Sequence, residues 1–112
     1  LGMEVLLEIR EKAELKSICS DVDAVGVNNR NLKDFSVNVK QSFDLANLIP
    51  NNFIKVSESG IDSVKTIYEL KKAGFNGFLI GEVFMKHSRP EIACAEFVKQ
   101  VNEYKADKKK AA

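Results

Sequence analysis

The chain has 112 residues, which suits one domain of ordinary size. Its residues are 45% hydrophobic and 29% charged, a balance typical of a globular protein and unlike that of a disordered chain. The formal net charge is +1, so the composition gives no reason to expect nucleic acid or a membrane surface as a partner.

No apolar run reaches the roughly 18 residues that a membrane span needs, and no signal peptide opens the chain. Cys19 and Cys94 lie far apart and outside any metal-binding spacing, so we expect two free thiols buried on the apolar sides of helices. The single His87 has no second Cys or His near it to share a metal. These features favour a cytoplasmic protein without a metal. The start at Leu1-Gly2, already running into a strand, suggests a piece of a longer protein.

The first half of the chain alternates strand and helix. We predict an apolar strand over residues 3–9 and a helix with one apolar face over residues 11–19. Residues 23–28 form a second strand, followed by a loop over residues 32–38. Residues 39–48 then form a helix that Pro50 and two asparagines end.

The second half repeats this alternation. A third strand covers residues 53–57, and the next helix has Asp62 or Ser63 as its N-cap and Gly74 just past its end. A fourth strand covers residues 78–81. The chain then forms one short helical turn over 82–85 and a final helix from Pro90 to about residue 104, which buries Ala93, Phe97 and Val101.

The pattern therefore contains four strand–helix units at intervals of roughly 25 residues. All four strands are nearly continuous apolar runs, as parallel strands covered on both faces should be. We predict an α/β fold with a parallel sheet in sequential strand order, which favours half of a (β/α)₈ barrel over a doubly wound sheet. This half-barrel would span residues 1–104, and residues 105–112 would form a basic, solvated tail.

Polar residues and glycines follow all four strands at the point where each strand stops. Because the carboxyl ends of parallel strands share one rim of a sheet, these residues should lie near one another. Backbone N–H groups at glycine turns and at helix starts bind anions, so we expect a phosphorylated small molecule as ligand. The absence of a GxGxxG or P-loop pattern argues against a nucleotide. The residues concerned are Glu8, Asn28, Arg30, Glu58, Ser59, Gly60, Gly81 and Glu82.

Four short segments, which contain the residues just named, together resemble the C-terminal half of indole-3-glycerol-phosphate synthases. They are LLEI at 6–9, NNRNL at 28–32, SESGI at 57–61 and FLIGE at 78–82. The resemblance implies a (β/α)₈ barrel of tryptophan biosynthesis that needs neither metal nor cofactor. It also implies a lyase reaction that closes and decarboxylates 1-(2-carboxyphenylamino)-1-deoxyribulose 5-phosphate to indole-3-glycerol phosphate, releasing carbon dioxide and water.

The resemblance also implies roles for single residues. Glu8 matches a carboxylate that takes part in proton transfer, and Glu58 one that lines the substrate site; both, with Asn28, are the candidate catalytic residues. The candidate substrate-binding residues are Arg30 beside the substrate, Leu79 against its aromatic ring, and the phosphate-holding turns formed by Ser59, Gly60, Gly81 and Glu82. Glu82 stands where some members of the family have serine, a difference that a backbone contact would survive.

The resemblance leaves out the first half of the family's barrel. In the family, strands one to three supply the general-acid lysine, a second lysine and a further glutamate. Lys33 and Lys55 do not replace these lysines. Lys33 lies in a loop, and Lys55 points away from the face of Glu58. We therefore expect half an enzyme, inactive alone. The alternative is a non-catalytic phosphate-binding half-barrel. Four strands cannot close a barrel, so either version should pair through its open edges, as a homodimer or with the missing N-terminal half. A third interpretation, a phosphate-binding barrel isomerase of the same pathway, is disfavoured by the NNRNL segment.

Overall fold

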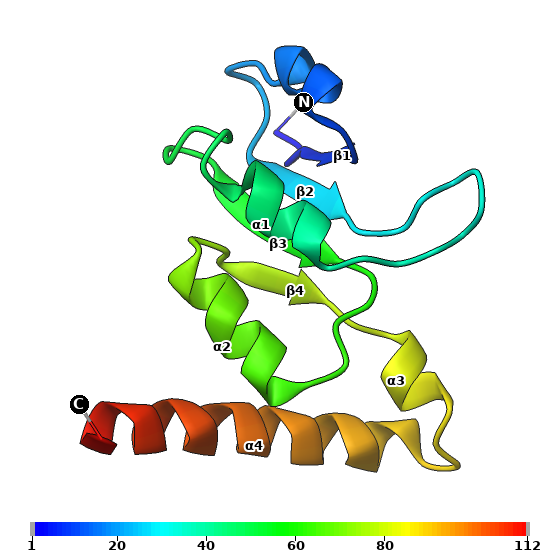
Figure 1. Cartoon of the computed structure of the whole chain (residues 1–112), viewed down its shortest axis with the longest axis vertical. Helices are drawn as coiled ribbons and strands as arrows, with labels where there is room; N and C mark the ends of the chain where they lie inside the picture. Colours follow the sequence, from blue (N-terminus) through cyan, green and yellow to red (C-terminus); the bar gives the residue numbers. More distant parts are fainter. Residues whose placement is uncertain (1, 112) are drawn as a thin grey trace.

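The computed structural model describes the backbone of residues 2–111 and the side chains of residues 2–104. Four strands alternate with one 3₁₀ helix, η1, and four α-helices (Figure 1). In chain order the elements are β1 (Leu6–Ile9), η1 (Lys12–Ser17), β2 (Ala24–Asn28), α1 (Lys40–Ala46), β3 (Ile54–Glu58), α2 (Val64–Lys72), β4 (Gly77–Leu79), α3 (Glu82–Met85) and α4 (Pro90–Ala111).

The strands form one parallel sheet in the order β1-β2-β3-β4, which confirms the sequential topology predicted from the sequence. Neighbouring strands align their side chains in layers across the sheet, as in a barrel. One layer contains Glu8, Gly26 and Val56, and the layer at the carboxyl edge contains Asn28, Glu58 and Leu79. The fold is a partial TIM barrel of four strand–helix units.

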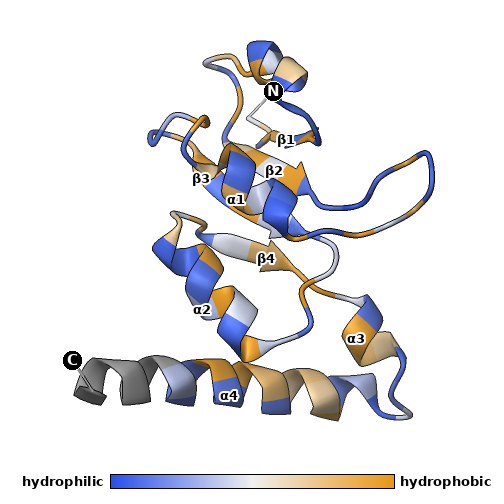
Figure 2. Cartoon of the chain, viewed as in Figure 1, coloured by the Kyte–Doolittle hydropathy of each residue, from blue (hydrophilic) through white to orange (hydrophobic). Residues whose placement is uncertain are grey.

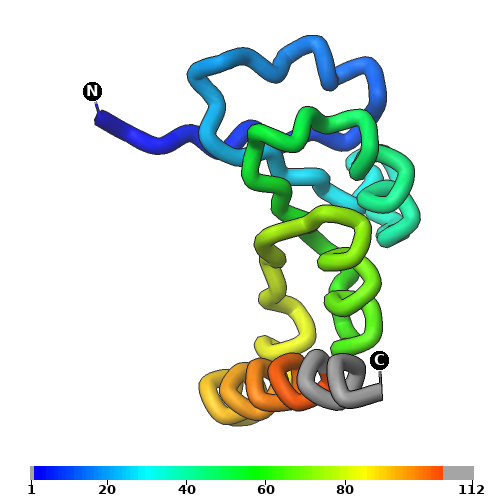
Figure 3. Tube along the Cα trace, turned by 90° about the vertical axis from the view of Figure 1, so that its left-hand side faces the viewer, coloured from blue at the N-terminus to red at the C-terminus, as the bar shows by residue number. Residues whose placement is uncertain are grey.

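One face of the sheet, which we call the outer face, packs against helices and forms the core. Figures 1 and 3 show α1 and α2 on the same side of the sheet, with α4 lying along α2 and α3. Figure 2 shows that α1 and α2 contain many hydrophilic residues with apolar ones between them. The buried core consists of apolar residues from the strands, from α1 and α2, and from the adjoining loops: Ile9, Val22, Val25, Val27, Leu45, Ala46, Ile49, Ile61, Ile67, Leu70 and Phe75.

Lys55 lies on the outer face, as predicted. Side chains alternate along a strand, and Lys55 is an odd number of residues from both Ile54 and Glu58, so it points to the opposite face from them. Its side chain is buried, and Nζ donates hydrogen bonds to the carbonyl oxygen of Ala46 at 2.8 Å and to Oδ1 of Asn51 at 3.1 Å. Lys55 therefore joins β3 to the end of α1 and takes no part in the opposite face of the sheet.

The opposite, inner face would line the interior of a complete barrel. Leu6, Ile54 and Leu79 point to this face from three strands and remain 49–54% exposed. These side chains are too large and apolar to be typical of a free protein surface when they share one face. The structure thus has a covered outer face and an uncovered inner one.

The segment after β1 differs most from its predicted form. Instead of a helix over residues 11–19, the chain forms only the short 3₁₀ helix η1, begun by a capping box between Glu11 and Glu14. Ile18 has extended backbone angles, which ends the helix early. Cys19 therefore lies beyond the helix and is exposed, so the prediction of a buried thiol there was wrong. Cys94 on α4 is half-buried, and both cysteines are free.

Several boundaries also shift. The first strand is shorter than the predicted residues 3–9, with Met3 and Val5 exposed, and the fourth ends two residues early. Ser63 is the N-cap of α2, with Oγ accepting a hydrogen bond from the Thr66 amide.

The last helix, α4, extends past the expected end near residue 104. The side chains of the predicted basic tail, 105–112, lie outside the described residues. Among the helices of the described chain, none has both the length and the apolar character to cross a bilayer.

Candidate functional site

The candidate site is a cavity of about 710 Å³ at the carboxyl edge of β3 and β4. Seven of the nine residues predicted from the sequence line it: Arg30, Glu58, Ser59, Gly60, Leu79, Gly81 and Glu82. The other two, Glu8 and Asn28, follow from β1 and β2 and connect to this cavity through hydrogen bonds. The structure therefore brings all nine together, while their roles remain predictions.

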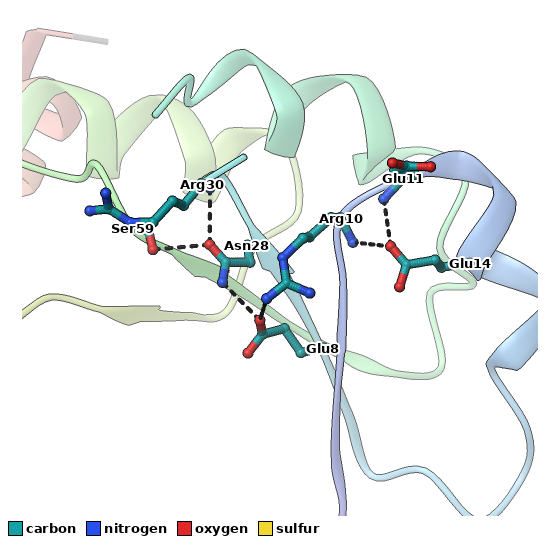
Figure 4. Close-up of polar contacts among 7 residues, drawn as sticks. All are labelled: Glu8, Arg10, Glu11, Glu14, Asn28, Arg30 and Ser59. Atoms are coloured by element: carbon teal, nitrogen blue, oxygen red, sulfur yellow. Dashed lines mark hydrogen bonds and ion pairs between the residues drawn. The ribbon is translucent and has the colours of Figure 1, made fainter. Parts of the chain in front are cut away.

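Asn28 is the centre of the connection (Figure 4). Its Nδ2 donates to Oε1 of Glu8 at 2.7 Å, and its Oδ1 accepts hydrogen bonds from the Ser59 hydroxyl and the Arg30 amide, both at 3.0 Å. Both ends of the amide are used, so its orientation is fixed by its partners. Asn28 thus links the carboxylate of the first strand to the turn that follows the third.

Arg10 adds a positive charge beside Glu8. One guanidinium nitrogen lies 2.7 Å from Oε1 of Glu8, and this ion pair is half-exposed. Glu8 consequently accepts two hydrogen bonds, one from an amide and one from a guanidinium.

Glu58 has the opposite surroundings. The residue is only 8% exposed, and its Oε2 has no hydrogen-bond partner among the described residues. Burial raises the pKa of Glu58, and the neighbouring Glu8 carboxylate raises it further, while Arg10 opposes the shift. Gly26 lies next to Glu58 on the adjoining strand, and a Cβ atom at Gly26 would collide with Oε2 of Glu58. The missing side chain of Gly26 therefore provides the space that Glu58 occupies.

Two carboxylates in different environments are what acid–base chemistry requires. Glu8 is partly exposed and hydrogen-bonded, whereas Glu58 is buried and one of its oxygens has no partner among the residues that the structure describes. A carboxyl group whose pKa is raised by burial can hold a proton until a bound molecule takes it up. Glu58 is the candidate for such a group, beside the hydrogen-bonded Glu8.

The turn after β3 has an unusual backbone. Ser59 has φ +74° and Gly60 has φ +76°, so two successive residues are left-handed. That conformation is strained for serine and natural for glycine. A Cβ atom at Gly60 would also collide with a methyl group of Val37. The strained residue follows Glu58 directly, and strained backbone conformations are typical of functional sites.

Charged side chains cover the far end of the cavity. Arg30 donates to the carbonyl of Phe35 at 3.0 Å and lies 3.4 Å from a carboxylate oxygen of Glu82. Lys86 also lines the cavity, with Nζ 3.7 Å from the other oxygen of Glu82. Glu82 is therefore shared by two cations, and an anionic ligand would meet both of them here.

Three polar residues near the site were not singled out from the sequence. Arg10 follows Glu8 by two positions, so the alternation of a continuing strand could have placed it on the same face. Lys86 follows the short α3, where no pattern pointed to a ligand. Asn29 is buried on the outer face, and no periodicity distinguishes it from its neighbour Asn28.

The raised pKa of Glu58 predicts how stability changes with pH. Below the ordinary pKa of glutamate the carboxyl is protonated in both the folded and the unfolded chain, so burial carries no charge penalty. As pH rises through the higher pKa of the folded state, the buried group must ionise and stability is lost. Glu58→Gln removes this loss. In thermal unfolding, its midpoint should exceed that of the wild type by a few degrees at about pH 8, with the difference disappearing near pH 4.

Glu69→Gln is the matched control, since Glu69 is an exposed carboxylate on α2 that pairs with Lys65. It should not become more stable than the wild type at the higher pH. The contrary outcome would be a Glu58→Gln midpoint at or below that of the wild type at about pH 8. It would show that burial of the Glu58 carboxylate does not destabilise the fold.

Comparisons with known proteins agree with this geometry. The sequence profile described as "Indole-3-glycerol phosphate synthase" matches residues 1–97. The chain is 48% identical over 101 residues to the indole-3-glycerol phosphate synthase of Bacteroides thetaiotaomicron, covering 90% of this chain and 39% of that protein. It is 44% identical over 94 residues to the synthase of Sulfurimonas denitrificans, covering 83% of the chain and 36% of the relative.

A third relative, the synthase of Sulfurisphaera tokodaii, is 41% identical over 87 residues, which cover 77% of this chain and 35% of that protein. The chain thus spans less than two-fifths of the length of these three relatives. The profile match includes all four strands and every candidate site residue. The chain belongs to the indole-3-glycerol phosphate synthase family.

Proposed function

We propose that this chain is the C-terminal half of an indole-3-glycerol-phosphate synthase. The complete enzyme would close and decarboxylate 1-(2-carboxyphenylamino)-1-deoxyribulose 5-phosphate to indole-3-glycerol phosphate, with loss of carbon dioxide and water. The observation that best supports this is Glu58, which is buried beside Glu8 in the lining of the cavity, next to a strained turn, with one oxygen that has no hydrogen-bond partner within the described part of the chain. A carboxylate kept in such a position lowers stability, and a catalytic role accounts for it.

Each group of the site has a place in that chemistry. Ring closure needs an acid at a carbonyl group, and the later loss of water needs a base and then an acid. Glu8 and Glu58 would carry protons for these steps, with Asn28 holding the orientation of Glu8. Leu79, 51% exposed on the inner face, would contact the aromatic ring of the substrate.

The phosphate would bind at the other end of the cavity. Its site would combine the backbone of Ser59 and Gly60 with the Gly81-Glu82 turn, and Arg30 would lie nearby. Two negative charges on the ligand would compete with Glu82 for Arg30 and Lys86. A cytoplasmic location would suit both the two free cysteines and a phosphorylated metabolite.

The isolated half should not complete the reaction. The lysines that the family places on its first strands would come from the N-terminal half, which would also cover Leu6, Ile54 and Leu79 on the inner face. We propose that the complementary half docks through the two open edges, β1 and β4, and closes the barrel.

Mixing the two halves tests this proposal. The chain alone should show no synthase turnover above background, and addition of the N-terminal half of a family member should restore it. In the restored enzyme, Glu8→Gln or Glu58→Gln should reduce kcat by about 10² to 10⁴-fold, the usual contribution of acid–base groups. A fluorescence assay for indole-3-glycerol phosphate would measure both.

Lys55→Ala is the control for damage to the fold, because it removes buried hydrogen bonds from the outer face. It should lower stability by about 1–3 kcal/mol and leave kcat of the folded, restored enzyme nearly unchanged. Turnover by the isolated chain would overturn the proposal that it lacks an essential acid. A restored enzyme indifferent to both glutamate changes would overturn their roles.

The uncovered inner face supports a second candidate function, a non-catalytic phosphate-binding half-barrel that pairs with itself. Two copies related by a two-fold axis could place β4 of each beside β1 of the other, which would give eight parallel strands and no free edge. The same apolar side chains would then fill the interior of the closed assembly.

This assembly gives a prediction for the isolated chain. We expect light scattering at micromolar concentration to find a dimer or larger species, because burial of the inner face is favourable. Leu6→Lys and Ile54→Lys should shift the population to monomer, whereas Lys65→Glu on the exposed side of α2 should not. A monomeric wild-type chain would contradict the prediction.

A further inference from the structure

Asn29 lies directly after β2 and points away from the cavity. It is 4% exposed, and its amide group makes four hydrogen bonds to buried or half-buried partners. Its Oδ1 accepts from the amide and the hydroxyl of Ser42, at 3.1 and 2.8 Å. Its Nδ2 donates to Oγ of Ser57 at 3.1 Å and to the carbonyl oxygen of Ser59 at 3.0 Å. Every donor and acceptor of this side chain is therefore used.

These bonds enclose Glu58 on both sides along the chain. The side chain of Asn29 holds Ser57 before Glu58 and Ser59 after it, while the backbone amide of Asn29 donates to the carbonyl of Glu58 at 2.8 Å. Three successive residues of β3 and the following turn thus depend on one residue. Asn29 itself lines no part of the cavity that contains Glu58.

Ser59 is held from two directions by consecutive asparagines. Asn28 accepts the Ser59 hydroxyl on the inner face, and Asn29 binds the Ser59 carbonyl on the outer face. Ser59 has the unfavourable φ of +74°, so without these bonds the turn would relax toward ordinary backbone angles. Such a relaxation would redirect the backbone groups of Ser59 and Gly60, two residues that line the cavity.

We propose that Asn29 is a positioning residue that fixes the left-handed turn at Ser59 and Gly60 in its anion-binding form. It acts through the Ser59 carbonyl and does not touch the ligand. The inference deepens the proposed function and rests on phosphate binding at this turn. If the role of Asn29 were purely structural, its substitution would lower only the stability of the fold, as the loss of any other buried hydrogen bond does.

Asn29→Asp separates the two roles. Aspartate keeps the acceptor toward Ser42 but removes both donors, and it places an oxygen against the Ser59 carbonyl. Ser42→Ala is the matched control: it removes the buried hydrogen bond from the Ser42 hydroxyl to the Asn29 amide oxygen, together with the bond between the Ser42 and Ser57 hydroxyls. The amide donors of Asn29 to Ser57 and Ser59 stay in place. Both variants of the 112-residue chain are titrated with inorganic phosphate while the backbone amide resonances of Ser59 and Gly60 are followed by NMR, well below each unfolding temperature.

We expect Asn29→Asp to weaken phosphate binding about tenfold or more and to shift or broaden the two amide resonances, while Ser42→Ala stays within about twofold of the wild type. Equal weakening by both variants, or wild-type binding by Asn29→Asp, would overturn the inference. If the wild type itself binds no phosphate, the proposed ligand fails. The resonances without phosphate then decide on Asn29: displacement only in Asn29→Asp supports the inference, and unchanged resonances overturn it.

Discussion

The parallel register of β2 against β3 is the constraint on which the site depends. It sets Asn28 opposite Glu58, so the next residue, Asn29, reaches the turn that follows Glu58. Because side chains alternate along a strand, the two asparagines separate: one faces the cavity and the other the buried outer layer. A shift of one residue in this register would exchange these faces and leave Glu58 and Lys55 each in the wrong environment.

The site is maintained at a cost to stability. Glu58 is buried with one oxygen that no described residue hydrogen-bonds, and Ser59 keeps a backbone conformation that serine rarely adopts. Hydrogen bonds from the outer layer, where Asn29, Ser42 and Ser57 are buried, offset part of this cost. The arrangement is typical of active sites, where function and stability make opposing demands.

The strands, their order and the rim of polar residues could be predicted from the sequence, because apolar runs and the residues that follow them are local signals. Lys55 was placed correctly by alternation alone. The four hydrogen bonds of Asn29 depend on tertiary structure and could not be predicted, nor could the 3₁₀ form of η1 or the exposure of Cys19. Alternation could have placed Arg10 on the face of Glu8, but it could not have shown that the two side chains form an ion pair. The space for Glu58 at Gly26 likewise appears only once β2 and β3 lie side by side. The resemblance to the family identified the site residues, but their environments come from the structure.

The state of Glu58 is the most direct test of this account. The side-chain carboxyl carbon of Glu58 can be followed by NMR during a pH titration, with assignment confirmed by its absence in Glu58→Gln. Burial beside Glu8 predicts that Glu58 titrates with a pKa above that of an ordinary glutamate, and that Gly26→Ala, which takes the space of its Oε2, alters this value. A Glu58 carboxyl that titrates at or below the ordinary glutamate value would contradict the account of the site.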